Sequence, residues 1–135
     1  MITYSNTAID VHEDQLLGFF QHWGKAPSPN ALLRILNGSD YIVLAREETS
    51  GAIVGYITAI SDGISCAYIP HLAVRTDWRE QGIGSALVQR MLAQLCELYM
   101  IDLMCDEDVM PFYERCGFHR YTGMIIRNYD RQACE

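Results

Sequence analysis

Residues 76–92 read TDWREQGIGSALVQRML and place two glycines directly before a stretch with helical apolar spacing. We expect a helix whose apolar face packs on a sheet, with Ile83, Leu87, Val88, Met91, Leu92 and Leu95 on that face. The start of such a helix presents unpaired backbone N–H groups and a partial positive charge. Because Gly82 and Gly84 carry no side chain, an anion can approach these N–H groups closely. The alternative is a tight helix start without a ligand, and the GIG sequence alone does not decide between the two.

The segments around this helix alternate between strand-like and helical patterns. Continuous or alternating apolar runs predict strands, whereas apolar residues spaced three and four apart predict helices. The expected strands span residues 2–5, 41–46, 52–61, 64–74 and 99–105, with a final strand or strand pair at 121–129; the expected helices span 11–23, 28–36, 83–95 and 108–116. This order predicts one domain, residues 1–135, of α/β (α+β) class with a mixed sheet.

Pro70 stands inside the strand-like run of residues 64–74. Proline lacks the backbone N–H that a strand donates to its neighbour, so within sheets it is confined to edges and bulges. We therefore expect the sheet to break locally at Pro70 and to open beside the residues that follow it.

The charge balance restricts the classes of partner. A formal net charge of -7 argues against nucleic acid, because a phosphate backbone requires a basic surface, and it mildly favours a cationic acceptor. No apolar run reaches the roughly 18 residues of a membrane span, and the N-terminal residues lack a signal-peptide pattern. The five cysteines include no C-x-x-C pair, which disfavours a zinc site and a disulfide framework. We expect a cytoplasmic protein with reduced thiols and no metal.

Two well-known phosphate-binding motifs do not fit the glycines. The Walker motif requires a lysine after its last glycine, and none follows Gly84. The dinucleotide fingerprint requires a third glycine where this chain has Leu87, and it begins directly after a strand, whereas seven residues separate Val74 from Gly82.

A third pattern does fit. The segment REQGIG, residues 79–84, matches the R/Q-x-x-G-x-G/A pattern of the GNAT superfamily of acyl-CoA N-acyltransferases. The resemblance extends over residues 69–119: IPHLAVRTDWREQGIGSALVQRML resembles the family's strand, loop and pyrophosphate helix, and LMCDEDVMPFYERCGFH resembles its later strand and tyrosine-bearing helix, in the form seen in arylalkylamine N-acetyltransferases. It implies the GNAT fold, a mixed and mostly antiparallel central sheet that is splayed at a strand bulge and flanked by about four helices.

The resemblance also implies acetyl-CoA as the co-substrate. The main chain of Leu72, Ala73 and Val74 would hold the pantetheine arm and the thioester. The pyrophosphate would be held by the following loop and helix start, which comprise Arg79, Glu80, Gln81, Gly82, Ile83, Gly84 and Ser85. The implied reaction is direct attack of a neutral amine on the thioester carbon, with a backbone N–H stabilising the developing oxyanion.

Tyr113 stands at the position of the family's general acid. A phenol with the ordinary pKa of about 10 can protonate a departing thiolate, whose acid has a pKa of about 8.5. The alternative is that Tyr113 packs on the sheet like its neighbour Phe112.

The acceptor side offers three candidate residues and no clear base. Tyr68 occupies a position where some relatives carry a carboxylate or histidine. His71 has the opposite strand parity unless the bulge turns it, and its alternative is a semi-buried histidine whose hydrogen bonds are satisfied and which takes no part in catalysis. Asp106, followed by Glu107 and Asp108, can line an acceptor pocket or deprotonate an ammonium through water. The alternative is helix capping, for which Asp108 is the candidate.

The region that sets acceptor specificity in the family carries Phe19, Phe20 and Trp23, which form either an apolar pocket or part of the core. The expected function is acetyl transfer to a primary amine of a small molecule or a protein. The alternative is a non-catalytic acyl-CoA-binding or regulatory domain. We expect no nucleic-acid or membrane partner, and a homodimer remains open.

Overall fold

The computed structural model describes all residues from 1 to 135. Its elements are, in chain order, β1 (Ile2–Ser5), α1 (Pro29–Gly38), β2 (Tyr41–Glu47), β3 (Ile53–Ser61), β4 (Cys66–Val74), α2 (Ile83–Gln94), β5 (Met100–Leu103) and α3 (Met110–Arg115), with short 3-10 turns between them. The five strands form one sheet in the order β1-β2-β3-β4-β5. All neighbours are antiparallel except β4 and β5, which run parallel. The mixed sheet predicted from the sequence is thus confirmed.

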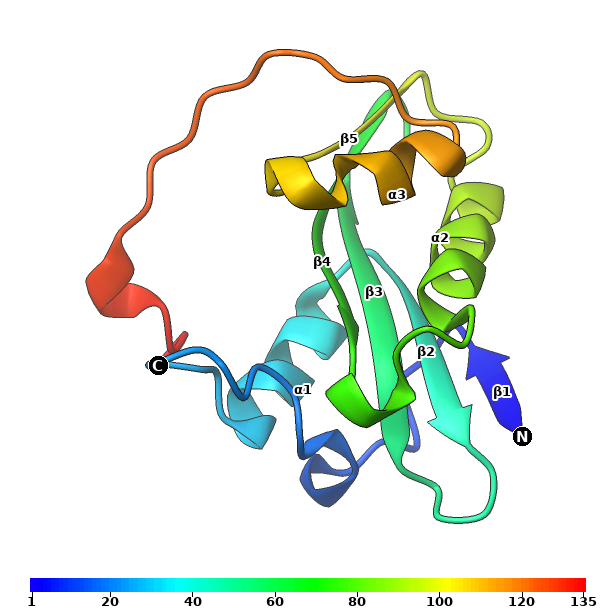
Figure 1. Ribbon diagram of the computed structural model, residues 1–135, viewed down its shortest axis with the longest axis vertical. Coiled ribbons are helices and arrows are strands. Elements are labelled where there is room, and N and C mark those ends of the chain that lie inside the picture. Colours follow the sequence, from blue (N-terminus) through cyan, green and yellow to red (C-terminus); the bar gives the residue numbers. More distant parts are fainter.

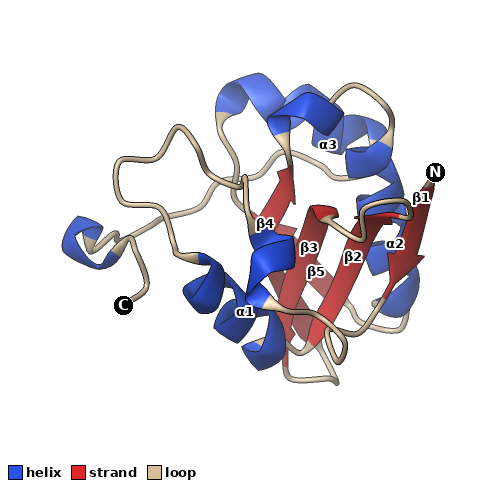
Figure 2. Ribbon diagram, turned by 90° about the horizontal axis from the view of Figure 1, so that it is seen from below, coloured by secondary structure: helices blue, strands red, loops and turns tan.

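The sheet is covered on both faces, as Figures 1 and 2 show. On one face α2 packs through Ile83, Leu87, Val88, Met91 and Leu95, and the half-buried Leu92 packs against the same cluster, so its predicted apolar side is confirmed. On the other face Leu32 and Leu36 of α1 pack with Leu44 and Tyr56 of the sheet. Strand residues alternate between the two clusters because successive side chains of a strand point to opposite faces. The sheet and α2 therefore hold the start of α2 in a fixed position.

Two sequence predictions of secondary structure are wrong. The helix expected over residues 11–23 is reduced to a 3-10 turn at Glu13–Leu16, so the sheet is flanked by three α-helices rather than about four. After that turn the backbone adopts positive φ at Gly18 (91°) and Phe20 (60°), which a continuous helix does not allow. Val11 and Leu16 still reach the core, which explains their helix-like spacing.

The strand expected over residues 121–129 is also absent. This stretch belongs to no helix or strand except at its last residue, where a 3-10 turn (Tyr129–Arg131) begins. In Figure 1 it forms the orange arc that leaves α3 and swings away from the body of the protein. The β-rich side chains are present, but no strand of the chain lies beside them to supply hydrogen bonds.

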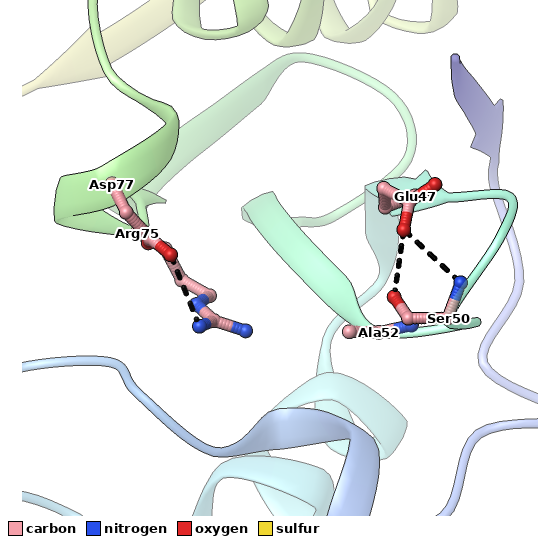
Figure 3. A network of polar contacts seen from close by, with 5 residues as sticks. All are labelled: Glu47, Ser50, Ala52, Arg75 and Asp77. Carbon is pink, nitrogen blue, oxygen red and sulfur yellow. Dashed lines mark hydrogen bonds and ion pairs between the residues drawn. The ribbon is translucent and has the colours of Figure 1, made fainter.

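Local polar contacts fix the ends of the elements. Ser28 caps α1, its Oγ accepting a hydrogen bond from the Ala31 N–H at 3.1 Å. In the β2–β3 turn, the Glu47 carboxylate accepts hydrogen bonds from the Thr49 and Ser50 N–H groups at 2.7 and 3.0 Å and from the Ser50 hydroxyl at 2.9 Å, and Figure 3 shows the contacts with Ser50. These bonds, of which the one from the Thr49 N–H has the largest effect, lower the pKa of Glu47 to about 2.

None of the helices has both the length and the apolar character needed to span a bilayer.

Candidate active site

The sheet opens between β4 and β5, as predicted from Pro70. The two strands pair only from Cys66 with Met100 to Ile69 with Leu103, after which β4 continues to Val74 with β3 as its sole neighbour. The register between β3 and β4 shifts at the same point, where the pair Ile60–Tyr68 is followed by the pair Thr58–His71. One residue of β3 thus faces two of β4, which is a β-bulge. The edge of Leu72, Ala73 and Val74 that faces away from β3 has no strand beside it.

The start of α2 presents a row of free backbone donors next to this open edge. None of the N–H groups of residues 80–85 donates a hydrogen bond to an acceptor of the chain. Positive φ at Glu80 (63°) and at Gly82 (81°), the residue that precedes the helix, turns the backbone just before the first turn. Successive N–H groups in such a turn, added to the partial positive charge of a helix start, form a concave anion site.

Arg79 fastens this loop to the end of β4. Its Nε donates a hydrogen bond to the Val74 carbonyl at 3.2 Å. The exposed side chain thus adds a positive charge beside the free N–H groups. The helix start, the arginine and the open strand edge fit a ligand that combines a phosphate group with an extended amide-bearing arm, which is the chemistry of coenzyme A.

One hollow of about 850 Å³ joins these parts. Of the residues predicted to hold a cofactor, it is lined by Leu72, Ala73, Val74, Arg79, Glu80, Gly82, Ile83, Gly84 and Ser85, and it is also lined by Tyr113. Gln81 is exposed and does not line it. Tyr68, His71 and Asp106 do not line it either. The structure therefore brings the predicted cofactor residues and the predicted acid together, and leaves the three acceptor-side candidates outside this hollow.

Tyr113 lies on α3, half-buried between two aromatic rings. The ring centroids of Phe112 and Phe118 lie 5.0 and 5.8 Å from its own, both nearly perpendicular to it. Burial, and next the neighbouring thiols of Cys105 and Cys116, raise the pKa of Tyr113 to about 12. The ordinary pKa assumed from the sequence was thus too low. A phenol in this environment stays protonated over the whole physiological range and is available as a proton donor.

The bulge turns His71 onto the same sheet face as Tyr68. In the register with β3, His71 pairs with Thr58 and Tyr68 with Ile60, and two residues that are two apart on β3 share a face. The imidazole packs near Phe20 and Tyr56, with ring centroids 6.3 and 6.2 Å away. Burial lowers the pKa of His71, so the ring is neutral at pH 7.

Two buried hydroxyls on the same face lack partners. The Tyr56 hydroxyl and the Thr58 Oγ1 are both buried, and neither has a hydrogen-bond partner. A buried hydroxyl without a partner costs free energy. These two groups and His71 therefore form a polar cluster with unused hydrogen-bonding capacity under the aromatic loop.

The other two acceptor-side candidates lie apart from this cluster. Tyr68 is exposed and lines a second hollow, between β5, α3 and the C-terminal segment. Asp106, Glu107 and Asp108 are exposed. None of these carboxylates caps α3, whose preceding residue is Val109 without a side-chain hydrogen bond. Asp106 lines neither hollow, and the helix cap considered for Asp108 is absent.

The aromatic residues of the first segment fit both expectations, because they line a pocket and two of them, Phe19 and Phe20, also pack against the core. Phe19, Phe20 and Trp23 line the same hollow as the start of α2. Gly18 allows this loop to lie close to β4, because a Cβ there would lie 3.0 Å from the Arg75 Nε. Arg75 is paired with Asp77 at 3.4 Å (Figure 3). The glycine at position 18 is the sequence signal that could have predicted this loop, since a glycine after a short apolar stripe often ends a helix.

Comparisons with known proteins agree with this geometry. Residues 37–120 match the family described as acetyltransferase (GNAT) domain. A crystal structure from Deinococcus radiodurans R1, of a protein classed as an acetyltransferase, is 47% identical over 98% of this chain and 92% of its own, with a TM-score of 0.94. A GNAT-family acetyltransferase from Streptococcus pneumoniae TIGR4 is 32% identical over 96% of this chain and 99% of its own, with a TM-score of 0.76.

A shorter match is to an enzyme that acetylates an arylalkylamine. Serotonin N-acetyltransferase from Macaca mulatta is 38% identical over 66 residues, which are 47% of this chain and 32% of that enzyme. This agrees with the resemblance of residues 103–119 to arylalkylamine N-acetyltransferases. The domain match spans most of the chain and includes β4, the start of α2 and Tyr113. The chain therefore belongs to the GNAT family of acetyltransferases.

Proposed function

We propose that this protein transfers an acetyl group from acetyl-CoA to the primary amine of a small acceptor with an apolar body. The observation that carries the proposal is the hollow of about 850 Å³, which joins the free N–H groups of the α2 start, the open edge of β4, Tyr113 and three aromatic side chains. Bound there, acetyl-CoA supplies an activated acyl group and a thiol leaving group.

Each part of the chain has a separate task in this proposal. The N–H groups of residues 81–85, with Arg79 beside them, bind the pyrophosphate. The open edge of Leu72–Val74 binds the amide-bearing arm and orients the carbonyl, to which a backbone N–H donates a hydrogen bond. The Tyr113 hydroxyl gives its proton to the departing sulfur. Phe19, Phe20 and Trp23 hold the body of the amine and exclude water.

The alternative is a domain that binds acyl-CoA without catalysis. Incubation of the protein with acetyl-CoA and a panel of amines separates the two. Because the chain has five free cysteines, released CoA is best measured by chromatography rather than with a thiol reagent. Amine-dependent release of CoA supports the enzyme. Tight acetyl-CoA binding by calorimetry without release for any amine supports the binding domain.

The aromatic loop predicts the order of acceptors. We expect aryl and alkyl primary amines to be better acceptors than polyamines or aminoglycosides, because the loop offers aromatic faces and no carboxylate. Trp23→Ala removes one ring of the pair with Phe20, whose centroids lie 4.5 Å apart. Its KM for aryl amines should rise roughly 2- to 10-fold, the value of one aromatic pair, with the KM for acetyl-CoA unchanged. Equal rates for all amine classes, or no change in Trp23→Ala, would contradict this assignment.

His71 is proposed to accept the proton of the incoming ammonium through water, since it does not itself line the hollow. Its lowered pKa keeps the imidazole neutral at pH 7, so activity should fall only as the pH drops through that pKa, below the ordinary 6.5. His71→Gln should lower kcat roughly 10- to 100-fold at pH 7 and remove this acidic limb. The exposed His12 provides a control: His12→Gln should keep the wild-type kcat at pH 7 and the acidic limb. A His71→Gln enzyme that retains the acidic limb would exclude His71 as the base.

A further inference from the structure

We propose that the C-terminal segment of residues 119–128 is exchanged between two copies of the chain and lies as a strand against β5 of the partner copy. This inference concerns assembly and does not depend on the proposed reaction. It rests on a strand-like segment without a partner, an open strand edge of the same chain, and the charges on both.

The segment has the side chains of a strand and none of its hydrogen bonds. It contains the apolar run YTGMIIRNY at residues 121–129. Tyr121, Met124 and Ile126 are 92%, 99% and 89% exposed. No residue from 119 to 127 takes part in a backbone–backbone hydrogen bond. An exposed apolar segment of this kind is typical of an interaction surface.

The complementary surface is the outer edge of β5. Met100–Leu103 pairs with β4 on one side, and no strand pairs with it on the other. An unpaired edge presents a row of N–H and C=O groups to which an added strand can pair. A hollow of about 700 Å³ lies beside this edge, lined by β5, α3 and the segment itself.

The segment does not fill the hollow of its own copy. It starts close to the end of β5, since a Cβ on Gly123 would lie 3.0 Å from the Met104 sulfur. Beyond that point it bows outward, and Figures 1 and 2 both show it standing off the body of the protein. The match to the Deinococcus radiodurans structure covers 98% of this chain with a TM-score of 0.94, so the outlying segment belongs to the shared shape.

The charges favour a second copy of this chain as the occupant. The chain carries a net charge of -7, yet residues 119–131 contain Arg120, Arg127 and Arg131 against the single acid Asp130. The exposed side chains around β5 and α3 are mostly acidic, with Asp102, Asp106, Glu107, Asp108 and Glu114 against Arg115. Arg120 is already paired with Glu114 of its own copy at 3.0 Å, so Arg127 and Arg131 are the cations of the segment that are left to meet the other carboxylates. In a dimer with a twofold axis, the basic segment of each copy lies on the acidic surface of the other, because each copy donates its segment and receives that of its partner. Tyr113 also lines this hollow, so the exchanged strand would close the α3 side of the site.

The first test is to measure the molar mass of the protein by size-exclusion chromatography with light scattering. The wild-type chain should have the mass of a dimer. Met124→Asp/Ile126→Asp places two acids in the segment opposite an acidic surface and should give a folded monomer by circular dichroism. Ile9→Asp changes an equally exposed residue (83%) outside the segment and should remain a dimer. A monomeric wild type, or a double variant that stays dimeric, overturns the proposal.

A cross-link distinguishes exchange from a segment that folds back on its own β5. One chain carries Ile125→Cys/Cys105→Ser, and a second, differently tagged chain keeps Cys105 and Ile125; both are co-expressed and treated with a short bismaleimide. Positions 105 and 125 line the same hollow. A link between the thiol introduced at position 125 and Cys105 can form here only between two chains, and exchange predicts it. If the dimer forms without this link, while a single chain that carries Ile125→Cys and keeps Cys105 is linked internally, the exchange is wrong.

Discussion

Gly84→Glu is expected to abolish acetyl-CoA binding at concentrations that saturate the wild type while leaving the fold intact. Gly84 lies in the first turn of α2, where a Cβ would meet Phe112 Cζ at 3.5 Å and Val74 Cγ2 at 3.9 Å, which are ordinary contacts. The added carboxylate would stand among the free N–H groups and repel the pyrophosphate. Hydrogen bonds to charged groups contribute about 1.5–3 kcal/mol each, so the loss of two weakens the affinity about 100-fold or more.

The matched control is Gly84→Ala, which adds the Cβ without the charge. Its φ is not in the left-handed region, and alanine favours a helix, so both its stability and its affinity should stay close to those of the wild type. Calorimetric titration with acetyl-CoA and thermal unfolding measure the two effects separately. A folded Gly84→Glu protein with wild-type affinity would remove the pyrophosphate from the start of α2.

Tyr113→Phe is expected to lower kcat about 100-fold with little change in the affinity for acetyl-CoA. The substitution keeps the ring and its packing against Phe112 and Phe118 and removes only the proposed proton donor, which acts in the transition state. The pKa of Tyr113 is about 12, above the thiol's 8.5, so the proton transfer is uphill. This places the effect at the lower end of the usual range for general acids, about 10²–10⁴-fold.

The same pKa fixes the pH dependence. A group that must stay protonated and has a pKa of about 12 remains active at about pH 10, so the wild-type rate should show no falling limb from Tyr113 up to the ordinary phenol pKa of about 10. A phenol with the ordinary pKa of about 10 would instead give a falling limb in that range. Tyr113→Phe should therefore lower the rate equally across it. Tyr41→Phe, a tyrosine of β2, is the control and should be unaffected. Wild-type turnover in Tyr113→Phe would leave Tyr113 a packing residue.

The parts predicted correctly from the sequence depend on local rules. The glycines at 82 and 84, followed by an apolar stripe, specify a helix start with free N–H groups whatever the rest of the fold, because these groups lack partners within the helix itself. Pro70 cannot donate to a sheet ladder, so it specifies a break in the pairing of its strand with a neighbour. The alternation of strand and helix patterns predicted a mixed sheet correctly, because it too depends on local sequence rules.

The wrong predictions concern segments whose state depends on a distant neighbour. Residues 11–23 have helical spacing, yet positive φ at Gly18 and Phe20 folds them into a loop over β4. Residues 121–129 have β-type side chains, but a strand exists only where another strand supplies hydrogen bonds, and this chain has none beside them. Sequence spacing records which side chains are apolar, and it does not record what they pack against.

The chemistry of the site divides along the same line. The sequence by itself predicted which residues offer free N–H groups to an anion and that Tyr113 follows β5, because these features are encoded in short motifs. Only the tertiary structure decided that the bulge turns His71 onto the face of Tyr68 and Tyr56. It also raised the pKa of Tyr113 by burial and placed Phe20 and Trp23 in the same hollow as the start of α2. The sheet face on which a side chain lies, its burial and its neighbours arise from contacts between segments far apart in the chain, and no local sequence pattern specifies them.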